Sequence, residues 1–381
     1  MRIAVPVEQQ AGEARVALVP ESVKKLAGTG VEVGVESGAG LKSGYLDDEY
    51  KAAGAGVMDR ATLLHGADIL ACVNRPSPND VASLKPGAIV IGFLKPLDEP
   101  AALEPVISRQ LTAFAVELVP RITRAQSMDA LSSMATIAGY KAVIMAADRL
   151  PRMFPLLMTA AGTVPPAKVL VLGAGVAGLQ AIATARRRGA VVEAYDVRAA
   201  AGQDVKSLGA KFLEVDLGGI ETQDVGGYAK ELSPEALKLG RDMVTKHAAV
   251  SDVIITTAQV PGRKAPLMLT EEAVSGMRPG SIVVDLAAST GGNCALTRAG
   301  EEVDHNGVTI LGPLNVPATV PGHASQLYSR NLTAFLALIN DKGNLKMDMG
   351  DEILKGSCVT YQGGSVHPRV AAALGHTVVS A

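Results

Sequence analysis

The sequence predicts a protein of the α/β class with two domains, each built on a parallel sheet that is flanked by helices. Three observations lead to this prediction. The chain has 381 residues, which is too long for one ordinary hydrophobic core. Short apolar runs alternate with helical segments along most of its length. Apolar residues make up 48% of the chain and 40 residues are glycine, a balance typical of buried parallel strands joined by glycine-containing turns.

The first third of the chain alternates between strands and helices. Apolar runs of strand length cover residues 2–6, 31–36, 68–74, 88–94 and 111–117. Between them, segments such as 20–27 and 59–65 carry apolar residues at helical spacing. We therefore expect a first parallel sheet with helices packed on it.

A second alternation of strands and helices begins after residues 163–166. Its expected strands are residues 168–172, 191–196, 211–215, 252–257, 281–285 and 309–311. The Ala- and Met-rich stretch 128–153 is expected to link the two domains as a helix, and the amphipathic helix 324–338 to return the chain to the first domain. The predicted domains are residues 1–129 with 319–381, and residues 130–318. We expect two Rossmann-like domains with a cleft between them.

Composition and charge exclude several classes of function. The net charge of −2 supplies no basic field for a phosphate backbone, and aromatic residues reach only 3%, so nucleic acid is not an expected partner. Cys72, Cys294 and Cys358 form no CxxC pair, so neither a disulfide framework nor a metal site is expected. A reducing cytoplasm fits this cysteine usage better than an oxidising compartment.

No secretory or membrane-spanning segment is expected. The first ten residues, MRIAVPVEQQ, lack the basic segment and apolar core of a signal peptide. Apolar runs such as 88–94 and 282–288 stop near strand length, well short of the ~20 residues that a membrane helix needs.

The clearest motif is a glycine-rich turn between a strand and a helix. The strand at 168–172 runs directly into Gly173-Ala174-Gly175-Val176-Ala177-Gly178, and a helix, a second strand and Asp196 follow. Gly173 permits the tight turn, Gly175 lets backbone N–H groups approach a pyrophosphate, and Gly178 lets the helix pack close to the strand. The helix N-terminus at Val176 then offers partial positive charge and unpaired N–H donors to the phosphates.

The acid that ends the second strand indicates which dinucleotide binds. Asp196 lies 23 residues after Gly173, where a carboxylate accepts hydrogen bonds from the adenosine ribose hydroxyls. It would repel a 2′-phosphate, so NAD(H) is favoured over NADP(H). Val197 and Arg198 follow in the same segment, and because a nearby arginine can accommodate that phosphate, NADP(H) stays open. The alternative is a glycine turn in a Rossmann-like sheet that binds no nucleotide.

A polar segment, residues 120–129, follows the last expected strand of the first domain. It contains Arg121, Gln126, Ser127 and Asp129 and lies where α/β proteins assemble their sites. Ser127 or Asp129 could serve only as the N-cap of the next helix. A cap does not require Arg121 or Gln126, so a functional role for the segment is also open.

A second loop, residues 217–234, has the composition of a mobile lid. Paired glycines, including Gly227, flank a polar stretch, and Tyr228 follows as a candidate contact residue. An ordinary surface excursion is the alternative. Both remain open.

Four segments, residues 15–20, 120–129, 159–167 and 227–231, together resemble one family. They are similar to the alanine dehydrogenase and transhydrogenase superfamily, and the last three resemble the NAD(H)-binding component (domain I, in the alpha subunit) of proton-translocating NAD(P) transhydrogenases. The resemblance spans essentially the whole chain.

The resemblance implies roles for individual residues. It places Arg121, Gln126 and Asp129 in the loop that contacts the dihydronicotinamide, with Ser132 close to its carboxamide. Tyr228 would belong to the mobile loop that closes over bound nucleotide.

On the adenosine side, the resemblance implies contacts from Asp196 and Arg198. Gln259 would contact the nucleotide through its backbone. The cofactor-binding residues expected from the motif and the resemblance together are Gly173, Gly175, Val176, Gly178, Asp196, Val197, Arg198, Gly227 and Gln259.

The chain departs from the alanine dehydrogenase branch where that branch carries its acid–base residues. Alanine dehydrogenases use a Lys and a His in the first domain and an Asp in the second; the aligned residues here are Asn74, Phe93 and Ser289. An amino-acid substrate would have no proton acceptor from these positions. The pattern suits hydride transfer between two nicotinamides, which needs no side-chain base.

The resemblance therefore implies an NAD(P)⁺ transhydrogenase component. NADH would lie in the cleft and pass hydride directly to NADP⁺ on a separate NADP(H)-binding subunit, while membrane-spanning subunits move the proton. The chain would form a homodimer at the cytoplasmic face of the membrane. Two alternatives remain: an alanine dehydrogenase-like NAD-dependent oxidoreductase, and a non-catalytic module that senses NAD.

Overall fold

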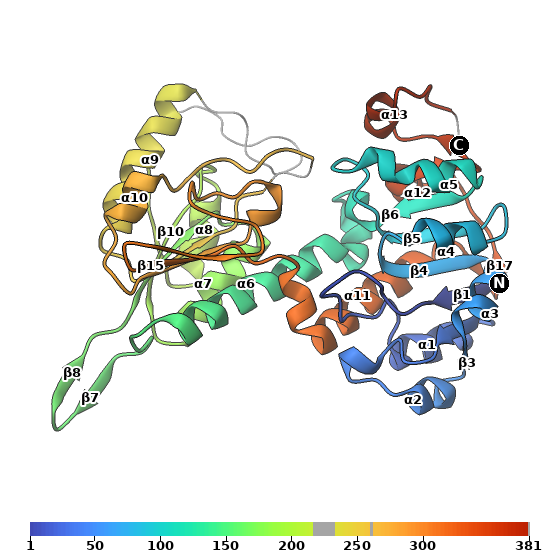
Figure 1. Ribbon diagram of the computed structural model, residues 1–381, viewed down its shortest axis with the longest axis horizontal. Helices are drawn as coiled ribbons and strands as arrows, with labels where there is room; N and C mark the ends of the chain where they lie inside the picture. The colour runs from blue at the N-terminus through green and yellow to red at the C-terminus, as the bar shows by residue number, and fades with distance from the viewer. Residues whose placement is uncertain (216–232, 260–261, 380–381) are drawn as a thin grey trace. The chain divides into compact units, whose positions relative to one another are not determined.

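The computed structural model describes residues 1–215, 233–259 and 262–379, and it divides into two compact units. Unit 1 consists of Met1–Met134 with Pro317–Ala381, and unit 2 of Ala135–Val316. Each unit is built on one large, mainly parallel sheet flanked by helices (Figure 1). The predicted α/β class with two parallel sheets is therefore confirmed.

The sheet of unit 1 has Rossmann strand order. Six parallel strands follow the order β3-β2-β1-β4-β5-β6, and the antiparallel pair β18 and β19 extends it beyond β6. In this order the strand sequence reverses between β1 and β4. The strands are β1 (Arg2–Val5), β2 (Glu32–Glu36), β3 (Gly56–Met58), β4 (Ile69–Asn74), β5 (Ile89–Phe93), β6 (Thr112–Ala115), β18 (Cys358–Tyr361) and β19 (Gly364–Ser365).

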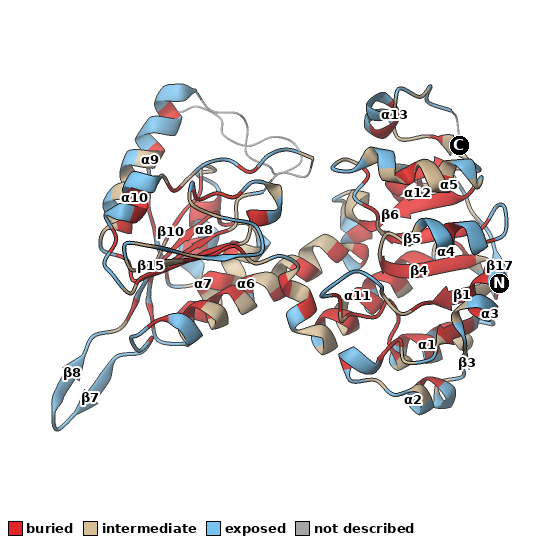
Figure 2. Ribbon diagram, viewed as in Figure 1, coloured by how far each residue is buried: buried red, intermediate tan, exposed pale blue. Residues whose placement is uncertain are grey.

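Helices cover both faces of this sheet, so its central strands are buried (Figure 2). On one face, Leu63 and Val81 pack into a core with the inward residues of β4 and β5. On the other face, Phe335 meets Phe114 edge to face at 5.4 Å between ring centroids. The helices of unit 1 are α1 (Pro20–Ala27), α2 (Asp47–Ala52), α3 (Arg60–His65), α4 (Pro78–Ser83), α5 (Glu104–Ser108), α11 (Pro321–Leu336), α12 (Glu352–Ser357) and α13 (Pro368–Leu374).

The sheet of unit 2 repeats the same order. Its parallel strands run β11-β10-β9-β12-β13-β15, and the antiparallel β14 lies at the edge beside β15. The order therefore reverses between β9 and β12. The strands are β9 (Lys168–Leu172), β10 (Val191–Tyr195), β11 (Lys211–Phe212), β12 (Val253–Thr256), β13 (Ile282–Asp285), β14 (Glu302–His305) and β15 (Val308–Leu311).

Alternate residues of β9 show how the two faces of this sheet are filled. Val169 and Val171 join a core with residues of α6, α7 and α8, whereas Leu170 and Leu172 join a core with residues of α9 and α10. Because every residue of the strand's interior is apolar, both faces are buried. The helices of unit 2 are α6 (Ala130–Arg149), α7 (Val176–Arg187), α8 (Ala201–Ser207), α9 (Pro234–Ala248) and α10 (Glu271–Ser275).

Helix α6 begins in unit 1 and continues into unit 2, as the sequence predicts for residues 128–153. An ideal Cβ at Gly139 would lie 2.1 Å from the carbonyl oxygen of Ala177, so glycine lets α6 approach α7 closely. Ala142, Val143 and Ala146 are buried in the core of unit 2. Among the described helices, α6 alone has the length and apolar composition to cross a membrane, properties that the buried core helices of globular proteins also have.

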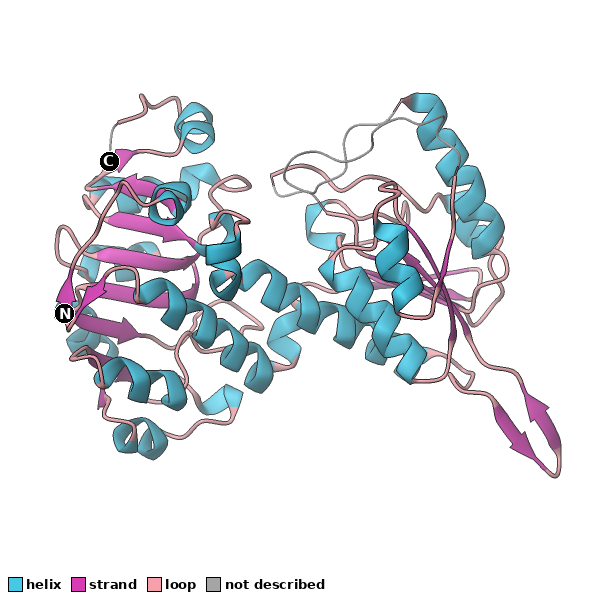
Figure 3. Ribbon diagram, turned by 180° about the vertical axis from the view of Figure 1, so that it is seen from behind, coloured by secondary structure: helices cyan, strands magenta, loops and turns pink. Residues whose placement is uncertain are grey.

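Several short strands escape the sequence prediction. The hairpin β7 (Leu157–Thr159) and β8 (Gly162–Val164) projects from unit 2 with every residue exposed (Figure 3). Because neither face of the hairpin is buried, its sequence shows no alternation of apolar and polar residues. The expected strand at 111–117 ends at Ala115, where a 3₁₀ turn (Val116–Leu118) takes over.

Candidate functional site

The two sheets share one strand order, but they differ at the edge where ligands of such sheets bind. Ligands of open α/β sheets bind beyond the carboxyl ends of the strands, at the point where the order reverses. In unit 2 that point lies between β9 and β12, and the glycine turn directly follows β9. The sequence motif therefore stands where the fold predicts a ligand.

Each glycine of the turn has a distinct geometry. Gly173 has φ +97°, and an ideal Cβ there would lie 2.6 Å from Thr257 Oγ1. An ideal Cβ at Gly178 would lie 1.9 Å from the carbonyl oxygen of Gly173, so glycine is needed where α7 crosses β9. At Gly175 no atom lies within 4 Å of the Cβ position. The turn is packed at two of its glycines and open at the third.

The open position is the N-cap of α7. Gly175 provides no side chain to cap the helix, and Val176, the first helical residue, is exposed. The helix is 12 residues long, so its first N–H groups carry the partial positive charge of a full macrodipole. These donors and the open space fit a pyrophosphate group.

Asp196 is buried at the end of β10 and holds the glycine turn. Its carboxylate accepts the backbone N–H of Ala174 at 2.7 Å. It also forms a bidentate ion pair with Arg198, with distances of 2.9 Å from Nε to Oδ1 and 2.8 Å from Nη2 to Oδ2. These charge-assisted hydrogen bonds raise the pKa of Arg198. Val197, between them, is partly buried against the core.

The loop after β12 is attached to the same turn. Thr257 Oγ1 donates to the carbonyl of Gly173 at 3.1 Å, and Gln259 Nε2 donates to the carbonyl of Leu286 at 2.9 Å. Gly227 and Tyr228 lie outside the described residues. The structure brings the remaining predicted nucleotide-binding residues to one sheet edge: Gly173, Gly175, Val176, Gly178, Asp196, Val197, Arg198 and Gln259.

In unit 1, the predicted catalytic residues lie around the start of α6. Arg121 and Gln126 are exposed, in or next to the 3₁₀ segment Thr123–Met128. The Asp129 carboxylate accepts the backbone N–H of Ser132 at 2.8 Å and its hydroxyl at 2.6 Å. Asp129 therefore caps α6, the structural alternative that the sequence leaves open, and it also fixes the Ser132 hydroxyl.

Two anchors hold this segment in place. Arg124 pairs with the Asp351 carboxylate at 2.7 and 3.1 Å, and its hydrogen bonds are the largest cause of the lowered pKa of Asp351. Asn331 Nδ2 on α11 donates to the carbonyl of Ser127 at 2.8 Å. The segment is thus tied to two helices that are more than 200 residues away in the chain.

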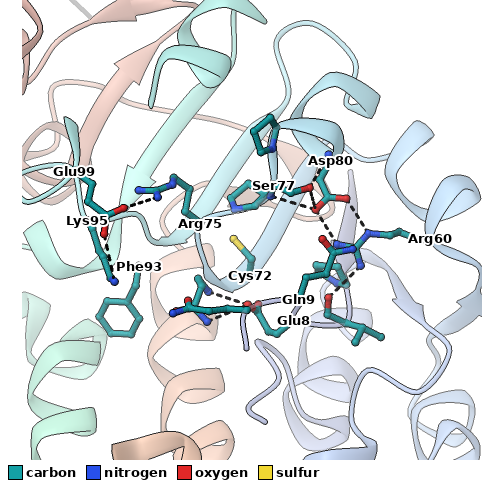
Figure 4. Close-up of a pocket in the computed structure, with 16 residues that line it drawn as sticks. Glu8, Gln9, Arg60, Cys72, Arg75, Ser77, Asp80, Phe93, Lys95 and Glu99 are labelled. Atoms are coloured by element: carbon teal, nitrogen blue, oxygen red, sulfur yellow. Dashed lines mark hydrogen bonds and ion pairs between the residues drawn. The ribbon is translucent and has the colours of Figure 1, made fainter. Parts of the chain in front are cut away.

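The corresponding edge of unit 1 holds a polar cavity of about 490 Å³ (Figure 4). Here the Glu8 carboxylate accepts the backbone N–H groups of Val73 and Asn74 at the end of β4. The Arg60 guanidinium is paired with Asp80 at 2.8 Å. The Glu8 carboxylate thus occupies the backbone donors at the end of β4, and residues 6–11, directly after β1, include no glycine. This edge of unit 1 therefore lacks the open glycine turn that unit 2 has after β9.

Two buried carboxyls of unit 1 are not singled out by the sequence. Burial raises the pKa of Glu8 and of Glu117 to about 7. Glu117 Oε1 accepts the backbone N–H of Lys95 at 2.6 Å, and its Oε2 is buried without a hydrogen-bond partner among the described residues. Only their position after strands β1 and β6 could have marked them.

Two of the three residues that the resemblance aligns with acid–base positions make contacts within unit 1. Asn74 Nδ2 donates to the Glu13 carboxylate at 2.8 Å. Phe93 stacks on Tyr328 with ring centroids 5.4 Å apart. Ser289 is exposed. None of the three side chains is a proton acceptor in the neutral pH range.

The Rossmann order of unit 2 and its open glycine turn define an α/β protein of the dinucleotide-binding class. Residues 4–138 match the family model "Alanine dehydrogenase/PNT, N-terminal domain", and residues 142–368 match "Alanine dehydrogenase/PNT, C-terminal domain". The chain belongs to the alanine dehydrogenase/PNT family. The resemblance expected from the sequence is confirmed.

The identity of the chain to individual relatives differs between the transhydrogenase and the alanine dehydrogenase branches of this family. The chain is 49% identical to the first part of the NAD(P) transhydrogenase alpha subunit of Rhodospirillum rubrum, over 97% of this chain and 98% of that protein. It is 30% identical to the alanine dehydrogenase of Bacillus subtilis, over 100% and 97%. The crystal structure of a transhydrogenase from Sinorhizobium meliloti superposes with a TM-score of 0.89 at 46% identity, covering 96% of this chain and 100% of the other.

Proposed function

We propose that this chain is the NAD(H)-binding subunit of a proton-translocating nicotinamide nucleotide transhydrogenase, and that hydride passes directly between its NADH and NADP⁺ on a partner subunit. The observation that carries the proposal is the glycine turn, open at Gly175 and held to Asp196 through Ala174. The higher identity to the transhydrogenase relative than to the alanine dehydrogenase supports the same branch.

Residues of unit 2 would hold the adenosine and pyrophosphate parts of the dinucleotide. The N–H groups at the start of α7 would bind the phosphates, and the absent side chain of Gly175 leaves room for them. The Asp196 carboxylate already accepts four hydrogen bonds, from Ala174 and Arg198, so a ribose hydroxyl would replace one of the Arg198 bonds. Arg198 is engaged with Asp196, which favours NAD(H) over a nucleotide with a 2′-phosphate. NADH supplies the hydride when it is bound.

Residues of unit 1 would position the nicotinamide ring. Arg121 and Gln126 would orient it, and Ser132, whose hydroxyl is fixed by Asp129, would contact its carboxamide. Tyr228 would help to exclude water. Catalysis would consist mainly of bringing two carbons to within ~3–3.5 Å of each other, since hydride transfer between nicotinamides needs no general base.

An alanine dehydrogenase-like oxidoreductase is the alternative. It is supported by the family and by 30% identity to one such enzyme. The side chains of Asn74 and Phe93, however, offer no base for amino-acid chemistry. A module that only senses NAD would bind nucleotide and transfer no hydride.

Assembly with other subunits is also proposed. The chain would assemble with NADP(H)-binding and membrane-spanning subunits and would lie at the cytoplasmic face of the membrane. Its functional units would be the domains 1–129 with 319–381 and 130–318. The exposed hairpin β7–β8 supports a homodimer, because four apolar residues in it or directly before it are 37–74% exposed: Leu156, Leu157, Met158 and Val164.

One assay separates the three functions. The purified chain is incubated with NADH and an NADP⁺ analogue, with and without the NADP(H)-binding subunit, and separately with NADH, pyruvate and ammonia. The transhydrogenase proposal predicts reduction of the analogue only when the subunit is present. Oxidation of NADH by pyruvate and ammonia with the chain alone would establish the alternative instead. Binding of NADH without reduction in any mixture would leave the sensing module.

A further inference from the structure

Asn293 is a fully buried residue in the loop that follows β13, and its side-chain amide forms hydrogen bonds with the loop that follows β12. Its Oδ1 accepts the backbone N–H of Ala258 at 3.0 Å, and its Nδ2 donates to the carbonyl of Ala258 at 2.9 Å. The same Nδ2 donates to the carbonyl of Pro266 at 2.8 Å. One side chain thus satisfies both backbone groups of Ala258, as a neighbouring strand would.

A buried acid holds Asn293 in turn. Asp285 ends β13 with no exposed surface, and its carboxylate accepts the backbone N–H of Asn293 at 2.8 Å. Five N–H and O–H donors surround it in all: Thr256 Oγ1, Ala287 N, Asn293 N, Cys294 N and Thr297 Oγ1. A carboxylate with this many donors is stable in a buried position and fixes the loop 286–297.

The loop that follows β12 lies at the sheet edge where the strand order reverses. Asp196, on the β9–β11 half of the sheet, marks that half for the adenosine mononucleotide. The β12–β15 half would then serve the nicotinamide mononucleotide. Ala258 and Gln259 lie directly after β12, and Thr257 ties them to the glycine turn. Their backbone therefore lies at the junction of the two halves.

We propose that Asn293, oriented by Asp285, is a positioning residue for the nicotinamide half of the bound dinucleotide. This inference rests on the proposed function. Asn293 acts through the backbone of Ala258 and Gln259, which it holds in one orientation before the nucleotide arrives. Such preorganisation strengthens binding because the loop loses less conformational freedom when the ligand binds. The adenosine half, held by other residues, does not depend on it.

The test compares two ligands that differ in the nicotinamide half. Affinities for NADH and for ADP are measured by calorimetry on the full chain and on the variants Asn293→Ala and Asn293→Ser. The serine keeps a polar hydroxyl at the position of the amide carbon. We expect NADH affinity to fall by about ten-fold or more in Asn293→Ala and by less in Asn293→Ser, with ADP affinity within about two-fold of wild type in both.

A matched control is Ser281→Ala. Ser281 lies just before β13, at the end of the strand opposite to Asn293, and its buried hydroxyl donates to the carbonyl of Ser251 at 3.4 Å. Thermal unfolding of all variants is recorded, and the control should alter stability without changing the ratio of NADH to ADP affinity. An equal loss of both affinities at Asn293, or no loss at all, would overturn the inference. Wild-type chain that fails to bind NADH would instead refute the proposed function, so the two failures are distinguishable. Should Asn293→Ala not fold, the same comparison on Asn293→Ser decides.

Discussion

The Asp196 carboxylate accepts the backbone N–H of Ala174 at 2.7 Å, so the acid that ends β10 also holds the glycine turn that follows β9. This bond joins two elements of one site that the sequence presents as separate motifs 22 residues apart. A mutation in the glycine turn and a mutation of Asp196 should therefore both affect nucleotide binding.

The glycines of the turn should separate folding from binding. Gly175→Ala should unfold near the wild-type temperature, because its φ of −78° suits alanine and no atom lies within 4 Å of the new methyl group. It should bind NADH at least about ten-fold more weakly, since the methyl group occupies the space needed by a phosphate. Gly178→Ala is the matched variant: its methyl group would meet the Gly173 carbonyl, and we expect a loss of roughly 1–3 kcal/mol or more in unfolding free energy. Calorimetry and thermal melts measure both. Unchanged NADH affinity in Gly175→Ala would contradict the assignment of the turn.

Replacement of Asp196 should weaken nucleotide binding and reduce its specificity. Asp196→Ala removes the acceptor for the ribose hydroxyls and the partner of Ala174, and it releases Arg198. NADH affinity should fall by about ten-fold or more, and the preference for NADH over NADPH should shrink. Glu193→Ala, which removes an acid of the same strand that pairs with Lys211 and His247, is the control and should bind NADH normally. A normal NADH affinity in Asp196→Ala would refute the ribose contact.

The exposed polar residues of unit 1 should act on hydride transfer more than on binding. Gln126→Asn and Arg121→Ala are expected to slow the transfer to an NADP⁺ analogue by about ten-fold or more, while the Kd for NADH changes by less than about three-fold. Stopped-flow kinetics with the NADP(H)-binding subunit give the rate. Arg330→Ala, which removes an exposed arginine that pairs with Glu21, should behave as wild type. If the two test variants lost only affinity, their assigned roles would be wrong.

The buried carboxyl of Glu117 should make stability depend on pH. Burial raises its pKa from 4.5 to about 7. Between pH 4.5 and about 7, Glu117 is therefore protonated in the folded protein and ionised in the unfolded chain. Stability is therefore lost as pH rises from about 5 to 7, by on the order of 3 kcal/mol once the group is fully ionised. Glu117→Gln, which is neutral at every pH, should flatten this part of the profile, whereas the exposed Glu214→Gln should not. Thermal melts from about pH 5 to 8 give the slopes. Identical slopes in wild type and Glu117→Gln would contradict the buried, protonated state.

The hairpin β7–β8 should mediate self-association. Met158, which is 74% exposed, can accept a charge with little loss of internal packing. We expect wild-type chain to sediment as a dimer and Met158→Asp to sediment as a monomer at micromolar concentration, with an unchanged unfolding temperature. Leu46→Asp, at another exposed apolar position, should remain dimeric. A dimeric Met158→Asp would exclude this hairpin as the interface, and a monomeric wild type would exclude the homodimer.

Local sequence predicts those parts of the fold whose residues depend only on their neighbours. Strand β9, the glycine turn, helix α7, strand β10 and Asp196 follow one another within residues 168–196, and each residue type there has a local reason. The helix over Pro20–Ala27 is predicted with its observed bounds, because its apolar residues repeat at helical spacing.

Features that depend on distant residues escape the sequence prediction. The pairing of Arg124 with Asp351 joins residues 227 positions apart, and the hydrogen bond from Asn331 to Ser127 spans 204. The same holds for the strand order, the burial of Glu8 and the contacts of the Asn293 amide. These features arise only when the strands of each sheet are assembled, so the local sequence does not predict them. Asp129 shows the reverse: its capping role is one of the two roles that the sequence predicts for it, because a cap is a local feature.

A crystal structure of the chain with NADH tests the central claim most directly. We expect the pyrophosphate at the N-terminus of α7, beside Gly175, and the adenosine ribose on the Asp196 carboxylate. A dinucleotide bound in the cavity beside Glu8 and Asn74, or none near Gly175 at saturating NADH, would contradict this placement and with it the proposed function.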